Sequence, residues 1–243
     1  MTQKVRGFLA NIICCCVYNK NARRKLRAIL SSDVIGQLRF IRRDIRTRIT
    51  KVKFFVGYQG RNLIIAVNDK YIYKFPLRRP NATELTLREK RVVDVLGKRS
   101  PIPTPAVCIL KYKNQLVRKY DFIHGCSLRQ MPPEKILAHI DTLAPKIAEF
   151  MYKIGQMNPP ELQDLKPADA GAPGYLYGWC QGDICDNFIM NPDTMEIIAF
   201  IDWEDNFYGK FDRFFRNQKR TPGRELMAAV LVEYDKLFYE CKK

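Results

Sequence analysis

Apolar and basic side chains recur with helical spacing in the first fifth of the chain. Between residues 22 and 50 the apolar positions return every three or four residues amid many arginines, which predicts a basic amphipathic helix. Ser31 and Ser32 interrupt the pattern, and Asp33 follows them with a residue type that caps helix starts. We therefore expect a break at the two serines and a new helix after Asp33.

The apolar period changes to that of β-strands after residue 50. Residues 52–56 alternate, apolar runs follow at 63–67 and 71–75, and the pair Asn68-Asp69 separates those two runs as a turn would. This pattern predicts three antiparallel strands, with the glycines at 57 and 60 in the first connection.

A second set of elements is expected between residues 82 and 122. The spacing predicts a helix over 82–98, and the proline-rich segment 100–105 must be an extended linker because proline cannot continue a helix. Two further strands are expected at 107–110 and 115–122. Helical spacing then begins at Pro132, and a last helix is expected over 225–239.

These elements together predict an α+β protein. We expect three segments: a basic amphipathic helical arm over residues 1–50, a β-rich lobe over 51–122, and a helical lobe over 123–243.

Positive charge is concentrated in the N-terminal arm. The chain has 42 Lys and Arg against 25 Asp and Glu, and residues 1–53 hold 14 of the basic side chains against two Asp. Such an arm favours an anionic membrane surface or nucleic acid. The apolar run 8–17 is shorter than the roughly 20 residues that span a bilayer, so we expect it to lie in the membrane interface or to pack on the body as a helix.

The compartment is expected to be the cytoplasm, with the protein peripheral at the inner face of the membrane. Eight Cys are scattered or contiguous rather than spaced like a secreted framework, which indicates reduced thiols.

The candidate chemistry lies in two neighbouring motifs. Asp183 and Asn187 belong to the loop Gly-Asp-Ile-Cys-Asp-Asn, and Asp202 ends the apolar run 197–201. Kinase-type phosphoryl transfer needs one carboxylate to accept the proton of the attacking hydroxyl, and a second carboxylate and an Asn to hold Mg²⁺. The order of the three side chains predicts this chemistry.

A nucleotide site is expected in the β-rich segment. Gly57 and Gly60 predict a loop that covers phosphates, although such a pair also makes ordinary turns. Lys74 on the third strand could pair with the phosphates and with Glu89 of the next helix. The alternative for Lys74 is an exposed position at a sheet edge.

With these parts in order, residues 50–240 resemble the aminoglycoside phosphotransferase-like branch of the protein-kinase-like fold. The resemblance implies a small antiparallel β lobe, a larger helical lobe, and ATP with Mg²⁺ as cofactors. Carried over, Asp183 is the catalytic base, and Asn187 and Asp202 bind the metal. The ATP-binding set comprises Gly57, Gly60, Lys74, Glu89 and the backbone of Tyr120 and Phe122.

The chain departs from the family pattern at two positions. Gln181 stands where the family usually has a His, and we expect its neutral side chain to brace the loop by hydrogen bonding. Asn187 falls four residues after Asp183 instead of five. Either the loop is one residue shorter, or Asn191 or Asp186 supplies the metal ligand.

The acceptor is expected to be a sugar hydroxyl, because the same motifs also resemble the heptose kinases of the lipopolysaccharide core. A basic region over 210–224 favours an acidic sugar or glycolipid at the membrane over a polycationic drug. Other possibilities are a small-molecule kinase of the aminoglycoside or choline type, a protein kinase, a pseudokinase scaffold, or a nucleic-acid-binding protein that uses residues 1–53.

Overall fold

The computed structural model describes most of the chain, namely residue 14, residues 18–57, 60–77, 80–182 and 184–212, residue 215, and residues 223–240. The chain divides into two compact units. Unit 1 comprises residues 1–87 and 107–122, and unit 2 comprises residues 88–106 and 123–243. Within the described residues, no helix combines the length and the apolar character needed to cross a bilayer.

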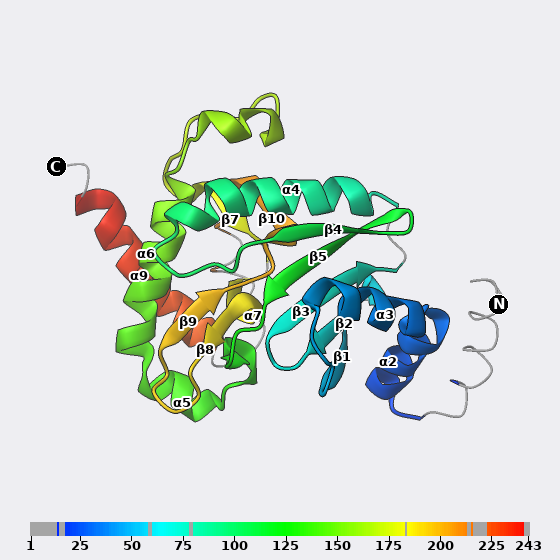
Figure 1. The fold of residues 1–243 in the computed structure, drawn as a ribbon. Helices are drawn as coiled ribbons and strands as arrows, with labels where there is room; N and C mark the ends of the chain where they lie inside the picture. The colour runs from blue at the N-terminus through cyan, green and yellow to red at the C-terminus, as the bar shows by residue number, and fades with distance from the viewer. Residues whose placement is uncertain are drawn as a thin grey trace. The chain divides into compact units, whose positions relative to one another are not determined.

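Unit 1 is built on a five-stranded antiparallel sheet in the order β1-β2-β3-β5-β4 (Figure 1). The five strands expected from the sequence are confirmed, with small shifts at their ends. Their bounds are β1 Val52–Val56, β2 Asn62–Val67, β3 Tyr71–Pro76, β4 Cys108–Tyr112 and β5 Gln115–Asp121.

Within residues 18–57 two helices precede the sheet, and the expected break between them is confirmed. The first, α2, spans Lys20–Ser31, and the second, α3, spans Val34–Ile45. The Asp33 side chain accepts a hydrogen bond from the Gly36 N–H at 3.4 Å and so caps α3. The apolar run 8–17, apart from Cys14, lies outside the described residues.

The core of unit 1 joins α3 to the sheet. Ile41 of α3 is fully buried with Leu63, Tyr73 and Phe75 of the strands, and the Phe40 ring packs edge-on against Phe75, with centroids 6.3 Å apart. Burial of apolar surface against the sheet holds α3 in place, so the helix belongs to the same core as β2 and β3.

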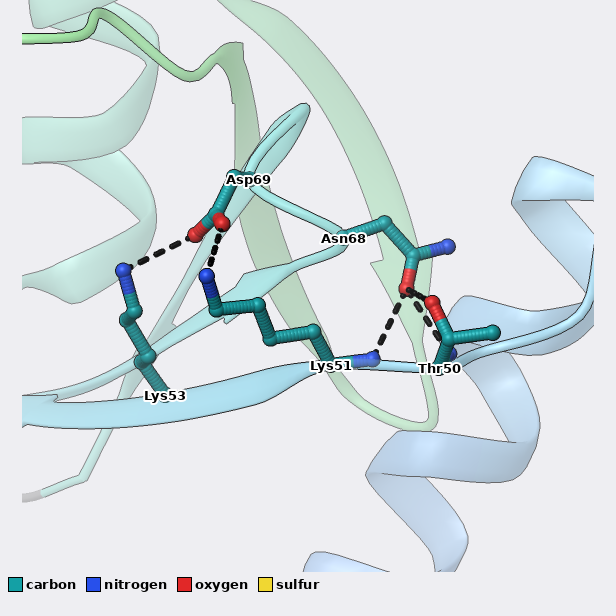
Figure 2. A network of polar contacts seen from close by, with 5 residues as sticks. All are labelled: Thr50, Lys51, Lys53, Asn68 and Asp69. Carbon is teal, nitrogen blue, oxygen red and sulfur yellow. Dashed lines mark hydrogen bonds and ion pairs between the residues drawn. The ribbon is translucent and has the colours of Figure 1, made fainter.

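The β2–β3 turn holds the segment that connects α3 to β1 (Figure 2). Asn68 and Asp69 have φ of 56° and 48°, a region that Asn and Asp tolerate better than most residues. The Asn68 Oδ1 accepts hydrogen bonds from the N–H groups of Thr50 and Lys51, at 2.9 and 3.1 Å. Asp69 forms ion pairs with Lys51 and Lys53.

Unit 2 is mainly helical, with short strands. Its helices are α5 Pro133–Ala138, α6 Ile140–Gly155, α7 Ile184–Asn187 and α9 Gly223–Glu240, together with the 3-10 helices η2 Gly97–Arg99, η3 Leu128–Gln130, η4 Pro160–Leu165 and η5 Trp203–Asp205. Its strands are β6 Cys126–Ser127, β7 Tyr177–Gln181, β8 Phe188–Met190, β9 Ile197–Phe200 and β10 Asn206–Lys210.

The helix α4 (Ala82–Val95) contributes residues to both units. It ends three residues before the expected Lys98, and a 3-10 turn follows from Gly97 to Arg99. Glycine is a poor helix former, which explains the early end. The proline-rich segment after it is free of helix, as expected.

Helices α6 and α9 pack side by side in unit 2 (Figure 1). The Tyr152 ring of α6 lies 5.9 Å from the Tyr234 ring and 6.5 Å from the Phe238 ring, measured between centroids. Gly178 brings β7 against the end of α6, because a β-carbon at this position would clash with the Gly155 carbonyl. The strand that leads into the motif loop is thereby fixed on the helical core.

Cys14, Cys108, Cys126 and Cys180 are free thiols, and for these four the expected reduced state is confirmed.

Candidate functional site

The first motif follows β7 directly. Gln181 is the last residue of that strand, and α7 begins at Ile184. Asp183 lies outside the described residues, so its role as catalytic base stays a prediction. Its position in the chain is bracketed by Gly182 and Ile184, whose surroundings are described.

Hydrogen bonds tie this loop to the second motif. The Gln181 side-chain Nε2 donates to the Asp202 backbone carbonyl at 2.9 Å, and the Gly182 N–H donates to the Asp205 carbonyl at 3.1 Å. Gln181 is buried, with 3% of its surface exposed. The expected brace by a neutral side chain is confirmed, and it connects the two motifs within unit 2.

Asn187 and Asp202 lie at corresponding ends of paired strands. The backbone carbonyl of Asn187 accepts a hydrogen bond of 3.0 Å from the Ile201 N–H, and Phe188 pairs with Phe200 in the β8–β9 register. Since Asp202 directly follows Ile201, the two predicted metal ligands are neighbours.

Aromatic packing fixes the backbone on both sides of this pair. The Phe200 ring lies 4.5 Å from Phe150, 4.9 Å from Phe188 and 5.2 Å from Trp203, between centroids. All four residues are buried. Asn187 precedes one of these rings and Asp202 stands between two, so a rigid apolar core carries both polar side chains.

Asp202 has an unusual backbone conformation, with φ 58° and ψ 63°. A left-handed conformation is uncommon outside glycine and occurs more often for Asp and Asn. Such residues cluster at functional sites, where the surrounding structure holds them. Here the conformation turns the chain from β9 into η5.

Three carboxylates gather around this point. Oxygen atoms of Glu89, Asp202 and Glu204 lie within 4.8 Å of one another, and Glu89 and Glu204 are buried. Oxygen donors of this kind are those that Mg²⁺ prefers, so the donor set fits a divalent cation. Like charges this close repel one another, which a cation would relieve.

The helix that carries Glu89 is anchored to the same loop. The Arg88 guanidinium donates through Nη2 to the Asn206 backbone carbonyl at 3.1 Å. Arg88 therefore connects α4 to the start of β10, next to η5. This contact keeps Glu89 beside Asp202 and Glu204.

Two other side chains that could have replaced Asn187 have different partners. Asp186 forms an ion pair with Arg129, and its backbone carbonyl accepts a 2.9 Å hydrogen bond from the Ser127 hydroxyl. The Asn191 Oδ1 accepts from the Asp193 N–H at 2.9 Å and caps the β8–β9 turn. Of the three candidates for the metal ligand, Asn187 is the buried one, and its backbone lies next to Asp202.

Lys74 lies in β3, the central strand of the sheet of unit 1, and only 6% of its surface is exposed. The alternative of an exposed lysine at a sheet edge is therefore excluded. In register with it on β5 is Arg118, which is also buried and donates to the Asn62 Oδ1 at 3.2 Å. Paired residues of an antiparallel ladder share a face, so two buried cations lie together.

The remaining residues expected to bind nucleotide have less distinctive surroundings. The Gly57 N–H bonds to the Asn62 carbonyl and the Gly60 N–H to the Gly57 carbonyl, both at 3.0 Å, while residues 58 and 59 between them are not described. Tyr120 pairs with Ile72 in the sheet. The Phe122 N–H donates to the Lys70 carbonyl at 2.8 Å. Because this N–H already has an acceptor, a nucleotide bound here would have to contact a different backbone group.

Sequence reasoning missed Arg118 and Arg129. The alternation of Val117 and Arg118 was a usable signal, because it places the two on opposite faces of a strand. Nothing in the sequence around Arg129 indicated its ion pair with Asp186, which depends on the tertiary fold.

No family model and no curated protein sequence matches this chain. Solved structures do. The GDP complex of wild-type aminoglycoside 2'-phosphotransferase-IIIa is similar with a TM-score of 0.68 and 17% identity, over 84% of this chain and 83% of that one. The macrolide 2'-phosphotransferase MphH from Brachybacterium faecium is similar with a TM-score of 0.57 and 14% identity, over 83% and 82%.

The streptomycin–ATP ternary complex of APH(2")-IIa gives a TM-score of 0.60 with 15% identity, over 84% of each chain. At these identities the comparison establishes the fold. The likeness extends over most of this chain. The chain therefore has the protein-kinase-like fold of the aminoglycoside and macrolide phosphotransferases.

Proposed function

We propose that this protein is an ATP-dependent phosphotransferase that transfers the γ-phosphoryl group to a sugar hydroxyl. The observation that carries the proposal is the placement of Asn187 next to Asp202, beside the carboxylates of Glu89 and Glu204. These oxygen donors occur on a fold that known phosphotransferases have. Phosphoryl transfer needs mainly positioning and charge stabilisation, which such an arrangement supplies.

The residues of unit 2 would have three roles: metal binding, proton acceptance and positioning of the loop. Asn187 and Asp202 hold Mg²⁺, which when bound neutralises charge on the phosphates. Asp183 accepts the proton of the acceptor hydroxyl. Gln181 keeps the loop of Asp183 in register with Asp202 through its 2.9 Å hydrogen bond.

The residues of unit 1 would bind the nucleotide phosphates. Lys74 and Arg118 form a buried cationic pair on adjacent strands, and their charge complements a triphosphate. The segment between Gly57 and Asn62 would cover the phosphates. The name of one structural neighbour records ATP bound to it, which supports ATP as the donor.

The acceptor is proposed to be an acidic sugar of a surface polysaccharide or of the lipopolysaccharide core. Residues 210–224 hold six Lys or Arg against one Asp. A basic acceptor region attracts phosphorylated sugars and repels polycations. Membrane attachment fits this acceptor, because the 14 basic side chains of residues 1–53 favour an anionic surface by about 1 kcal/mol each when close to it. We place the protein at the cytoplasmic face.

A small-molecule kinase of the aminoglycoside type is the second candidate. Structural neighbours include complexes with streptomycin and gentamicin. Charge weighs against it, since a chain of net charge +17 repels a polycationic drug.

Transfer of phosphate from Mg²⁺-ATP to a panel of core oligosaccharides and aminoglycosides, read by intact mass, tests the proposal. The wild type should phosphorylate a sugar of the first group. Asp202→Asn should lose the transfer, while Asp193→Asn in the exposed β8–β9 turn should retain it. Full transfer by Asp202→Asn would remove the metal assignment. Absence of ATP and Mg²⁺ binding to the wild type would select a pseudokinase scaffold.

A further inference from the structure

A groove in unit 1 is lined mainly by arginines. It encloses about 780 Å³ and lies along the C-terminal half of α3 and the segment that follows it. Arg39, Arg42, Arg43, Arg46 and Arg48 line it, together with Thr47 and Ile49. All five arginines are exposed. Among the described residues that line the groove, none is acidic and none is aromatic.

Three of these arginines form one stripe. Arg39, Arg42 and Arg43 are spaced by three and four residues, which puts their side chains on one face of α3. Arg46 follows as the left-handed C-cap of the helix. Like charges at these spacings destabilise a helix. Cations near a helix C-terminus are favourable, which accounts for Arg42 and Arg43 in the last turn of α3. It does not account for Arg39, a turn earlier, or for Arg48 beyond the helix.

The two carboxylates of this region are bound to other side chains. Asp44 accepts hydrogen bonds from the Tyr73 hydroxyl and from Lys119 at 2.7 Å. Burial raises the pKa of Asp44, but these bonds, with a longer-range contribution from Arg46, outweigh burial and lower the pKa. Asp33 accepts from Lys113 and, at 3.0 Å, from the Tyr112 hydroxyl.

The arginines consequently keep their charge available. In the described part of the chain, no ion pair joins any of the five to a carboxylate. A second hollow of about 280 Å³ shares Arg39 and Arg43 with the groove, and its wall also holds Lys111, Lys113 and Asp33, whose carboxylate is paired with Lys113.

The frame beneath the arginines is fixed. Ile41, on the opposite face of α3, is fully buried in the core of the sheet. The segment after the helix is held by Asn68, whose Nδ2 donates to the Arg48 carbonyl at 2.9 Å. The Asn68 Oδ1 accepts from Thr50 and Lys51 (Figure 2). A charged groove on a rigid frame loses little entropy when it binds an anion.

We propose that this arginine groove binds phosphate groups of lipid head groups at an anionic membrane surface, with a preference for phosphomonoesters. The proposal rests on the membrane association put forward above and names the chemistry that the arm recognises. The planar guanidinium pairs bidentately with phosphate oxygens, and a monoester offers a further negative charge and a free edge for such pairs. Single-stranded nucleic acid sites use aromatic side chains to stack bases, and the groove contains none.

Helix α2 supplies a matched control surface in the same unit. Lys20, Arg24, Lys25 and Arg27 are exposed on it, and none of them lines the groove. The test compares Arg42→Gln/Arg43→Gln/Arg46→Gln with Arg24→Gln/Lys25→Gln/Arg27→Gln in the full-length protein. Both variants lose three positive charges, so nonspecific attraction falls alike.

Co-sedimentation is measured with vesicles that contain phosphatidic acid or phosphatidylglycerol at equal surface potential. We expect the wild type to bind the phosphatidic acid vesicles about tenfold tighter, the scale of one well-formed charged hydrogen-bond pair. The α2 variant should weaken binding to both vesicles and keep the ratio. The groove variant should bring the ratio to about one.

A charge-preserving variant decides the matter if the glutamine variant fails to fold. Arg42→Lys/Arg43→Lys/Arg46→Lys keeps the charge and loses the bidentate geometry, so it should bind phosphatidylglycerol like the wild type and lose the preference for phosphatidic acid. A preference that survives in both groove variants overturns the proposal.

Two further measurements separate the possible anions. Inorganic pyrophosphate that displaces the protein from vesicles at micromolar concentration, or an RNA oligonucleotide bound more tightly than either vesicle, would overturn the assignment to lipid. A wild type that binds no anionic vesicle refutes the membrane association itself. Equal binding of the wild type and of the glutamine groove variant to phosphatidic acid vesicles refutes only the groove.

Discussion

Arg129 forms an ion pair with Asp186, and this contact joins the 3-10 turn after β6 to the helix that carries Asn187. The Ser127 hydroxyl adds a hydrogen bond of 2.9 Å to the Asp186 carbonyl. The loop between Gly182 and Asn187 is thus held from outside at Asp186.

Removal of the Arg129 side chain should reduce turnover more than stability. An exposed ion pair contributes only about 0.2–1 kcal/mol to folding, whereas a small displacement of a reacting group can cost about 10²-fold in rate. We expect Arg129→Ala to lower kcat roughly 10-fold to 100-fold with a nearly unchanged Tm. Arg99→Ala, which removes the exposed pair with Glu161, is the control. Equal kcat values for the two variants would refute this positioning role.

Gln181 should be needed for both stability and turnover. Gln181 is buried, and its partly buried 2.9 Å bond satisfies the Asp202 carbonyl. Gln181→Leu leaves that carbonyl without its donor, at a cost of about 1–3 kcal/mol in the free energy of unfolding. Gln181→His restores a donor and should recover most of the loss. Urea denaturation measures the energies, and a Leu variant as stable as the wild type would show that the bond contributes nothing.

Asp183 should affect the chemical step rather than nucleotide affinity. General-base action is worth about 10² to 10⁴ in rate, so Asp183→Asn should lose roughly that factor in turnover. The ATP dissociation constant should stay within about a few-fold, because a base contacts the acceptor hydroxyl. Both quantities are measured on the same preparations. If turnover and ATP affinity fell by similar factors, Asp183 would be assigned to metal binding or to a structural role instead of to base catalysis.

Acid should remove part of the stability that Asp33 gives to unit 1. The hydrogen bond from Lys113 is the main cause that lowers the pKa of Asp33, and the same contact raises the pKa of Lys113. A carboxyl group whose pKa is depressed by folding stabilises the fold above its ordinary pKa of about 3.9, and this stabilisation is lost as the pH falls below that value.

Asp33→Asn tests this, because Asn keeps the N-cap of α3 and removes the charge. The wild type should melt higher than the variant between about pH 5 and 9, and the difference in Tm should shrink below about pH 4. A difference that is independent of pH would assign the contribution to capping alone. Thermal melts followed by circular dichroism give both curves.

Much of the fold was predictable from the spacing of apolar residues and from the residue types in the turns. The strands of unit 1 alternate as β-strands do, and Asn68 and Asp69 occupy the positive-φ turn that their side chains favour. The break between α2 and α3 at Ser32 was also predictable from local sequence, because Asp33 is a residue type that caps helix starts. The end of α4 was missed by three residues, since the helical spacing continues through Gly97 while the backbone cost of glycine ends the helix.

The site was predictable where it depends on order along the chain. Asn187 and Asp202 are brought together by two strands that are adjacent in sequence. Contacts between distant segments were not predictable. The Arg88 bond to Asn206 and the gathering of Glu89 with Glu204 both join residues more than a hundred positions apart, and a single sequence holds no local signal for them.

Because Ile41 is buried in the core of the sheet, the positive charge of α3 cannot be removed by N-terminal truncation without damage to the fold. The helix that carries the arginine stripe also completes the apolar interior beneath Leu63 and Phe75. A shortened chain that begins at the first strand would lose most of its surplus of cations and its folded sheet in the same step. Evolution could therefore tune the affinity of the arginine groove by exchanging side chains along α3, but not by removing the helix.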